Sequence, residues 1–117
     1  TGHDGSLSTG HANSPKDMLS RLESMVLMGM DLPLGAVQRQ IASGIDIIVH
    51  LGRLRDKSRK VLEVSEILGY QDGEILVSPL YRFEETGEKD GKIQGTWRKM
   101  DDLVHTQKLL AAGYKEV

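Results

Sequence analysis

Two histidines near the start of the chain are the first residues whose spacing suggests chemistry. His3 and His11 each close a Thr-Gly-His near-repeat. A metal ion shared by both would need converging side chains, but the intervening residues span about 26 Å when extended, and no nearby carboxylate completes a ligand set. We therefore expect no metal site. His50 and His105 stand alone in the sequence, and we expect them to pack or to lie at the surface.

Motifs for a nucleophile or for a phosphate loop are missing from the sequence. Ser6, Ser8 and Ser14 lack the G-x-S-x-G turn that exposes a nucleophilic serine. The phosphate loop G-x-x-x-x-G-K-[ST] is also absent. Its nearest counterpart, residues 87–93, is one residue short, lacks the hydroxyl and precedes a predicted strand. Neither acyl transfer nor ATP binding follows from these motifs.

A cluster of cations occupies the middle of the chain. Five fall within eight residues: Arg53, Arg55, Lys57, Arg59 and Lys60. Two interpretations stay open. The cations are the solvated tip of a hairpin, or they contact phosphate, either of a nucleotide across a subunit boundary or of nucleic acid. With one Trp, one Phe and three Tyr, the chain has few platforms on which bases could stack, so nucleic acid is the less favoured partner.

Composition limits the class of protein that could present these groups. The 117 residues amount to about one domain, and 15 Lys plus Arg against 17 Asp plus Glu leave a net charge of −2, which indicates neither nucleic acid nor anionic lipid. The absence of cysteine excludes a disulfide scaffold, a thiolate metal site and a cysteine nucleophile. No apolar run exceeds four residues, whereas a bilayer span needs about 20.

Two helices are predicted directly after the histidine stretch, which itself is typical of a loop or a short buried strand. Ser14 is a candidate N-cap, Pro15 suits the first helical position, and Asp17 has the spacing of a capping box. Apolar residues then recur every three or four positions, which predicts a helix from Pro15 to about Met28. After a break at residues 31–33, the same spacing predicts a short second helix ending at Gly44.

Antiparallel strands are predicted to follow. The β-branched residues of 45–51 favour a substantially buried strand, and those of 61–68 favour its hairpin partner. Lys57 stands where a two-residue hairpin turn would favour glycine, so the turn type is left open. After a turn at residues 71–73, Pro79 makes the strand of residues 74–83 an edge strand or splits it.

The last third of the chain has the weakest pattern. Residues 84–91 are polar and acidic, which predicts an exposed, mobile loop, and the alternation of residues 92–99 predicts a final strand with one buried face. Asp101 and Asp102 would open a closing helix that Gly113 caps. Its apolar face would comprise Leu103, Val104, Leu110 and Ala111.

Several segments together resemble one known family. Residues 1–15, TGHDGSLSTGHANSP, resemble the histidine box of the secretion ATPase superfamily of type II and type IV secretion and pilus assembly. The segments LSRLE (19–23), QIASGID (40–46) and RLRDKSR (53–59) are similar to the Tad/Flp pilus, CpaF-like branch. The resemblance is close from Thr1 to about Ile67 and looser beyond.

The resemblance implies a fold and an activity. The chain would be the C-terminal part of a RecA-like P-loop NTPase domain, α/β as a whole and α+β in the isolated fragment, with helices packed on a mostly antiparallel sheet. The longer protein would be a cytoplasmic hexameric motor that hydrolyses ATP with Mg²⁺ and docks peripherally against platform proteins of the bacterial or archaeal inner membrane.

Site residues follow from the same resemblance. His3 and His11 would lie near the γ-phosphate and couple nucleotide state to movement, while Gly2, Gly5 and Thr9 would support them. The hairpin arginines Arg53, Arg55 and Arg59 are candidates for a subunit or partner interface, and no metal-ligating residue is assigned.

The chain is expected to be an excised piece. Residues 1–117 would form one portion of the motor domain, with the phosphate loop and the acidic Mg²⁺ residues upstream of Thr1, so the fragment alone should neither hydrolyse ATP nor bind it tightly. Residues 1–13 should then be mobile, because their strand would lack a neighbour. The alternative function is a non-catalytic module whose basic hairpin binds an acidic protein or nucleic acid.

Overall fold

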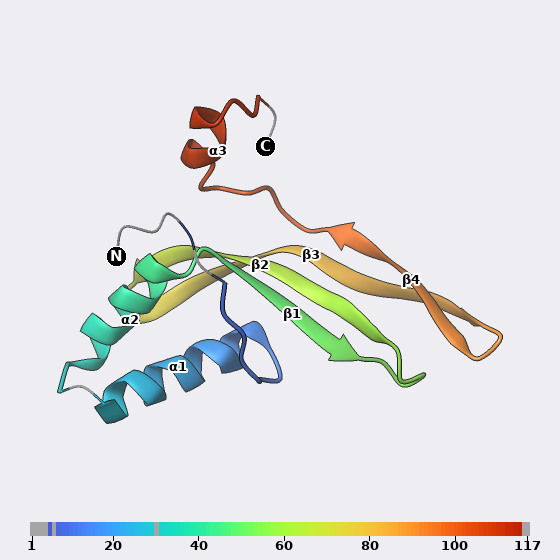
Figure 1. Ribbon diagram of the computed structural model, residues 1–117, viewed down its shortest axis with the longest axis horizontal. Helices are drawn as coiled ribbons and strands as arrows, with labels where there is room; N and C mark the ends of the chain where they lie inside the picture. Colours follow the sequence, from blue (N-terminus) through green and yellow to red (C-terminus); the bar gives the residue numbers. More distant parts are fainter. Residues whose placement is uncertain (1–4, 6, 30, 116–117) are drawn as a thin grey trace.

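The computed structural model describes residue 5, residues 7–29 and residues 31–115. In order, the elements are α1 (Pro15–Gly29), α2 (Leu34–Gly44), β1 (Ile47–Arg53), β2 (Arg59–Gln71), β3 (Glu74–Lys89), β4 (Lys92–Lys99) and α3 (Gln107–Ala111). The strands form one antiparallel sheet in the order β1-β2-β3-β4. Figure 1 shows α1 and α2 on one side of this sheet and α3 on the other.

The fold class is α+β, as expected for the fragment. Every strand pair among the described residues is antiparallel, so the parallel sheet of an α/β domain is not seen in this part of the chain. Residues 7–12 carry no regular secondary structure, and most of their side chains are exposed, so the alternative of a short buried strand is wrong for them.

Both predicted helices are confirmed. The Ser14 hydroxyl accepts a hydrogen bond from the Asp17 amide at 3.0 Å, and the Asp17 carboxylate accepts one from the Asn13 amide at 3.0 Å. These bonds satisfy donors that would otherwise be unpaired at the start of α1. The buried core joins the two helices to the sheet through Leu19, Val37, Ile41 and Ile67.

The first strand differs from the prediction of a substantially buried strand. In β1 the even-numbered residues are half-buried, whereas Ile47, Val49 and Leu51 are 41%, 50% and 64% exposed. Ile48 packs against the helical core from the other face. The prediction was wrong because a run of β-branched residues suits a strand whether one face or both are covered, and the helices cover only one face of β1.

The third strand is also longer and more central than predicted. Pro79 lies inside β3, which pairs with β2 on one side and β4 on the other, so the expectation of an edge strand is wrong. Pro79 is opposite Ser65, where the β2–β3 register shifts. An irregular position tolerates the missing amide donor of a proline.

Residues 84–91 are not a loop: they form the end of β3 and the turn that leads into β4. β3 runs on to Lys89, and Asp90 and Gly91 form the turn with φ of 54° and 76°. Positive φ at both central residues defines a tight hairpin turn, for which Asp-Gly is a preferred pair. Acidic residues are compatible with this part of the strand because most of its side chains face water.

The end of the chain is less helical than predicted. Only Gln107–Ala111 form α3, so Leu103 and Val104 lie outside it and share no helical face with Leu110 and Ala111. Gly113 does terminate the helix, with φ of 102°. The preceding residues are instead tied to the sheet, beginning with the Met100 amide, which donates to the carbonyl of Leu80 at 2.7 Å.

Candidate interaction site at the hairpin junction

The predicted interface arginines lie at the β1–β2 hairpin, whereas the described members of the predicted nucleotide group lie before α1. Gly2 and His3 lie outside the described residues. Gly5, Thr9 and His11 belong to the exposed irregular stretch before α1. His11 therefore presents an accessible imidazole close to the start of α1, and no three potential ligands among His, Asp and Glu gather to hold a metal ion within the described part of the chain.

The hairpin arginines divide into two groups. Arg53 and Arg59 are directly opposite each other across β1 and β2, and both are exposed. Neither makes an ion pair with any described residue. Like charges directly opposite on neighbouring strands destabilise a sheet. This pair therefore carries uncompensated positive charge on one face of the hairpin.

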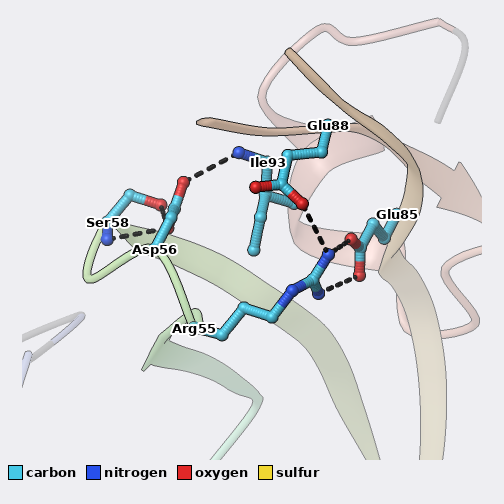
Figure 2. Close-up of polar contacts among 6 residues, drawn as sticks. All are labelled: Arg55, Asp56, Ser58, Glu85, Glu88 and Ile93. Carbon is cyan, nitrogen blue, oxygen red and sulfur yellow. Dashed lines mark hydrogen bonds and ion pairs between the residues drawn. The ribbon is translucent and has the colours of Figure 1, made fainter. Parts of the chain in front are cut away.

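Arg55 instead has partners within the chain. Its guanidinium binds the Glu85 carboxylate with two hydrogen bonds, one of 2.8 Å, and lies 3.6 Å from Glu88 (Figure 2). The bond to Glu85, followed by the Coulombic attraction to it, raises the pKa of Arg55, and the same bond lowers the pKa of Glu85. These side chains are well exposed, so we treat this pairing as an orienting contact and not as a main source of stability. Arg55 is not free for a partner in the way that Arg53 and Arg59 are.

Asp56 joins the turn after β1 to the start of β4. One carboxylate oxygen accepts hydrogen bonds from the amide and hydroxyl of Ser58 at 2.9 and 2.5 Å, and the other accepts from the Ile93 amide at 2.8 Å (Figure 2). The Ile93 amide, followed by the Ser58 donors, lowers the pKa of Asp56 to about 2. Lys57, with φ of 70°, occupies the left-handed conformation for which glycine would be favoured. The Asp56 bonds hold the turn in this conformation.

Trp97 makes the third connection at this junction. Its indole Nε1 donates to the carbonyl oxygen of Val61 at 2.6 Å, and its ring forms a T-shaped contact with Phe83, with the ring centroids 5.6 Å apart. Gly95 permits this packing, since an added Cβ would come 2.4 Å from the Phe83 ring. We call the contacts of Arg55 and Asp56 with the β3–β4 hairpin, together with the bond from Trp97 to Val61 on β2, the hairpin junction.

Sequence reasoning missed this junction. The polarity of residues 84–91 suggested a loop, and nothing in it identified Glu85 as a partner of Arg55, 30 positions earlier. The one available signal was Asp90-Gly91, which is typical of a tight turn between two strands.

A second polar cluster lies along β2. Burial raises the pKa of Glu63, but hydrogen bonds from Ser65 at 2.6 Å and Arg82 at 2.9 Å outweigh this effect, so the net pKa is lowered. His50, directly opposite Glu63 on β1, adds to that lowering. His50 is half-buried beside Glu63, in agreement with the prediction that it packs or lies at the surface.

Glu66 is the most deeply buried charged residue that the structure describes, with 2% of its surface exposed. Its two carboxylate oxygens accept hydrogen bonds from the amides of Val104 and His105 at 2.8 and 2.9 Å. The ring Nε2 of His105 lies 2.9 Å from the carbonyl oxygen of Leu68. Glu66 thus fastens the extended segment before α3 to the centre of the sheet.

Comparison with known proteins finds similarity over part of the chain. No known family profile matches the sequence. The chain is 31% identical over 75 residues to proteins from two strains of Mycobacterium tuberculosis, both provisionally named conjugal transfer proteins. The match covers 64% of this chain but only 21% of each relative, so the chain spans about a fifth of the length of the curated relatives it matches.

The helices of the described residues do not reach the length and apolarity that a bilayer crossing requires.

Proposed function

We propose that this chain is the C-terminal part of an ATPase motor domain that powers conjugal transfer, pilus assembly or protein secretion. The observation that carries the proposal is the histidine-box pattern of residues 1–15, followed by segments typical of CpaF-like ATPases. The similarity to conjugal transfer proteins about five times longer than the matched region supports it. The longer protein would be a cytoplasmic RecA-like hexamer on platform proteins of the inner membrane.

The residues of the chain fit one part of a nucleotide site. His11 is exposed and could donate a hydrogen bond to the γ-phosphate of ATP, with His3, Gly2, Gly5 and Thr9 in the same stretch. The start of α1 is a poor phosphate cradle because Ser14 and Asp17 already bind amides there and Asp17 adds negative charge. The phosphate loop and the Mg²⁺ ligands would come from elsewhere in the longer protein.

Mutation of His11 tests this proposal. In a full-length protein that carries this segment, His11→Ala should lower ATP turnover by about 10²-fold, the usual cost of removing one donor to developing charge. Ser8→Ala, an exposed residue of the same stretch with no assigned role in the nucleotide site, is the matched control and should keep its activity. Unchanged turnover in His11→Ala would contradict the assigned role.

The isolated chain provides a second test. It should show no Mg²⁺-dependent ATP turnover after contaminating ATPases are removed, because most of the nucleotide site would be missing. Turnover by the pure 117-residue chain would overturn the proposal that it is only one part of a motor.

A non-catalytic interaction module is the second candidate function. The specific observation that favours it is the opposed pair Arg53 and Arg59, exposed and without a counter-ion among the described residues. This function requires neither ATP nor His11, so the His11→Ala experiment separates the two candidates.

A further inference from the structure

The segment that joins β4 to α3 lies on the face of the sheet that α1 and α2 leave uncovered. Ile67 and Val77 pack against the helical core, so their neighbours Glu66 and Ser78 point to the opposite face, because successive side chains of a strand alternate. Figure 1 shows α3 on this opposite side. We call residues 101–115, which include α3, the C-terminal strap.

Glu66 and Ser78 form a covered pair beneath the strap. They are directly opposite each other on β2 and β3, and only 2% and 9% of their surfaces are exposed. The amides of Val104 and His105 donate to the two oxygens of the Glu66 carboxylate, so the strap lies against this pair. These donors are needed in the closed structure because a buried carboxylate without partners is costly.

Few polar contacts between described residues hold the strap in place. Besides the two bonds to Glu66, the His105 ring lies 2.9 Å from the carbonyl oxygen of Leu68. The ion pair of Lys99 with Asp102 is exposed and contributes little. None of the residues of α3, all of which the structure describes, is buried. Segments with so few buried contacts open at a lower free energy than the core.

The strap can leave the sheet without disrupting it. The ladder between β2 and β3, which carries Glu66 and Ser78, includes no strap residue. Water can replace the two amides at the Glu66 carboxylate once the strap has moved, so this charge has partners in both positions. The Met100 amide, which donates to the carbonyl of Leu80, anchors the chain just before the strap begins. Met100 is therefore the point about which the strap would swing.

We propose that the C-terminal strap is a hinged cover that opens from Met100 as one unit while the sheet stays folded, and that Glu66 holds it closed. Opening uncovers Glu66 and Ser78 at the centre of the sheet and lets α3 move. All the contacts involved lie between described residues, so the device does not depend on what the longer protein places against the rest of the sheet. It goes beyond the proposed function and requires no ATP, so its failure would leave the role assigned to His11 unaffected.

Reaction of an introduced thiol with an aromatic disulfide tests the proposal, because the chain has no cysteine of its own. Ser78→Cys places a thiol under the strap with little change of shape. Ser65→Cys is the matched control. Ser65 is fully buried, but it lies opposite Ile48 on the face that the helices cover. The labelling rates of the 117-residue chain are measured at increasing urea concentrations below the unfolding transition.

The proposal predicts that the thiol at position 78 reacts faster than the thiol at position 65. Its rate should depend only weakly on urea, since opening the strap exposes little surface, whereas the rate at position 65 should rise steeply, as global unfolding does. Glu66→Gln should accelerate labelling at position 78 by about tenfold without steepening its urea dependence, because an amide group then faces a backbone donor. Glu74→Gln, exposed at the start of β3, should leave the rate unchanged.

Amide hydrogen exchange of the unsubstituted chain is a second measurement that needs no variant. Val104 and His105 should exchange through an opening with the same weak urea dependence as labelling at position 78, whereas Ile67 should follow global unfolding.

Three results would overturn the proposal. Equal, steep urea dependence at positions 78 and 65 would show that the sheet must unfold before it is uncovered. Weak urea dependence of exchange at Val104 and His105, combined with steep dependence of labelling at position 78, would show that the strap loosens without uncovering the sheet. An unchanged labelling rate in Glu66→Gln would show that Glu66 does not hold the strap closed.

Discussion

The indole of Trp97 on β4 donates a hydrogen bond of 2.6 Å to the carbonyl oxygen of Val61 on β2. These strands are not neighbours, because β3 lies between them in the sheet. The contact forms where β3 has separated from β2, since their pairing ends at Glu63 and Arg82. Trp97 therefore replaces a missing strand as the partner of β2 and joins the two hairpins.

Loss of this donor should destabilise the protein. Trp97→Phe retains an aromatic ring beside Phe83 but leaves the Val61 carbonyl without its partner, at an expected cost of about 1 kcal/mol. Urea denaturation measured by circular dichroism gives the free energy of unfolding. Tyr81→Phe, an exposed aromatic residue on β3, is the control and should change it by less. Equal losses in both variants would show that the Trp97 hydrogen bond is unimportant.

Asp56 should make stability depend on pH. Its folded pKa of about 2 lies below the ordinary value of 3.8, so its stabilisation is complete above about pH 5 and is lost as pH falls through 3.8 toward 2. In Asp56→Asn, the change in unfolding free energy between pH 5 and pH 2 should be smaller than in the unsubstituted protein. Asp72→Asn, at the exposed turn between β2 and β3, is the matched control. A pH profile unaltered by Asp56→Asn would refute the role of this carboxylate.

Glu66 should hold the C-terminal segment on the sheet. Glu66→Gln replaces one acceptor oxygen by an amide group that faces a backbone donor, with an expected cost of about 1–3 kcal/mol. Hydrogen exchange should accelerate at Val104 and His105 more than at the core residue Ile67. Glu74→Gln, exposed at the start of β3, should not reproduce this pattern. Uniform acceleration throughout the sheet would instead indicate a general loss of stability.

Arg53 and Arg55 should respond in opposite directions to charge reversal. Arg53→Glu places a carboxylate opposite Arg59 and should stabilise the chain by about 0.5 kcal/mol. Arg55→Glu brings a like charge to Glu85 and should destabilise it. Thermal unfolding at low and high salt measures both effects, which should shrink as salt screens the charges. If both variants change the unfolding free energy with the same sign, the description of Arg53 as unpaired and Arg55 as paired with Glu85 is wrong.

Local sequence signals determined much of the secondary structure. Ser14, Pro15 and Asp17 predicted the start of α1 because caps and the first turn involve residues only a few positions apart. Helical spacing likewise predicted α2, and β-branched residues predicted β1 and β2. The histidine-box pattern and the basic hairpin were also visible in the sequence, although the ATPase role of the former stays a prediction.

Tertiary structure alone decided which of these groups meet. Whether Arg55 is free or bound depended on Glu85, and whether residues 101–106 are helical depended on Glu66, 38 positions before Val104. The exposed face of β1 likewise depended on which side the helices cover. The sequence determined short-range preferences because backbone sterics and capping act between near neighbours, whereas pairing between distant segments depends on how the whole sheet curves and packs.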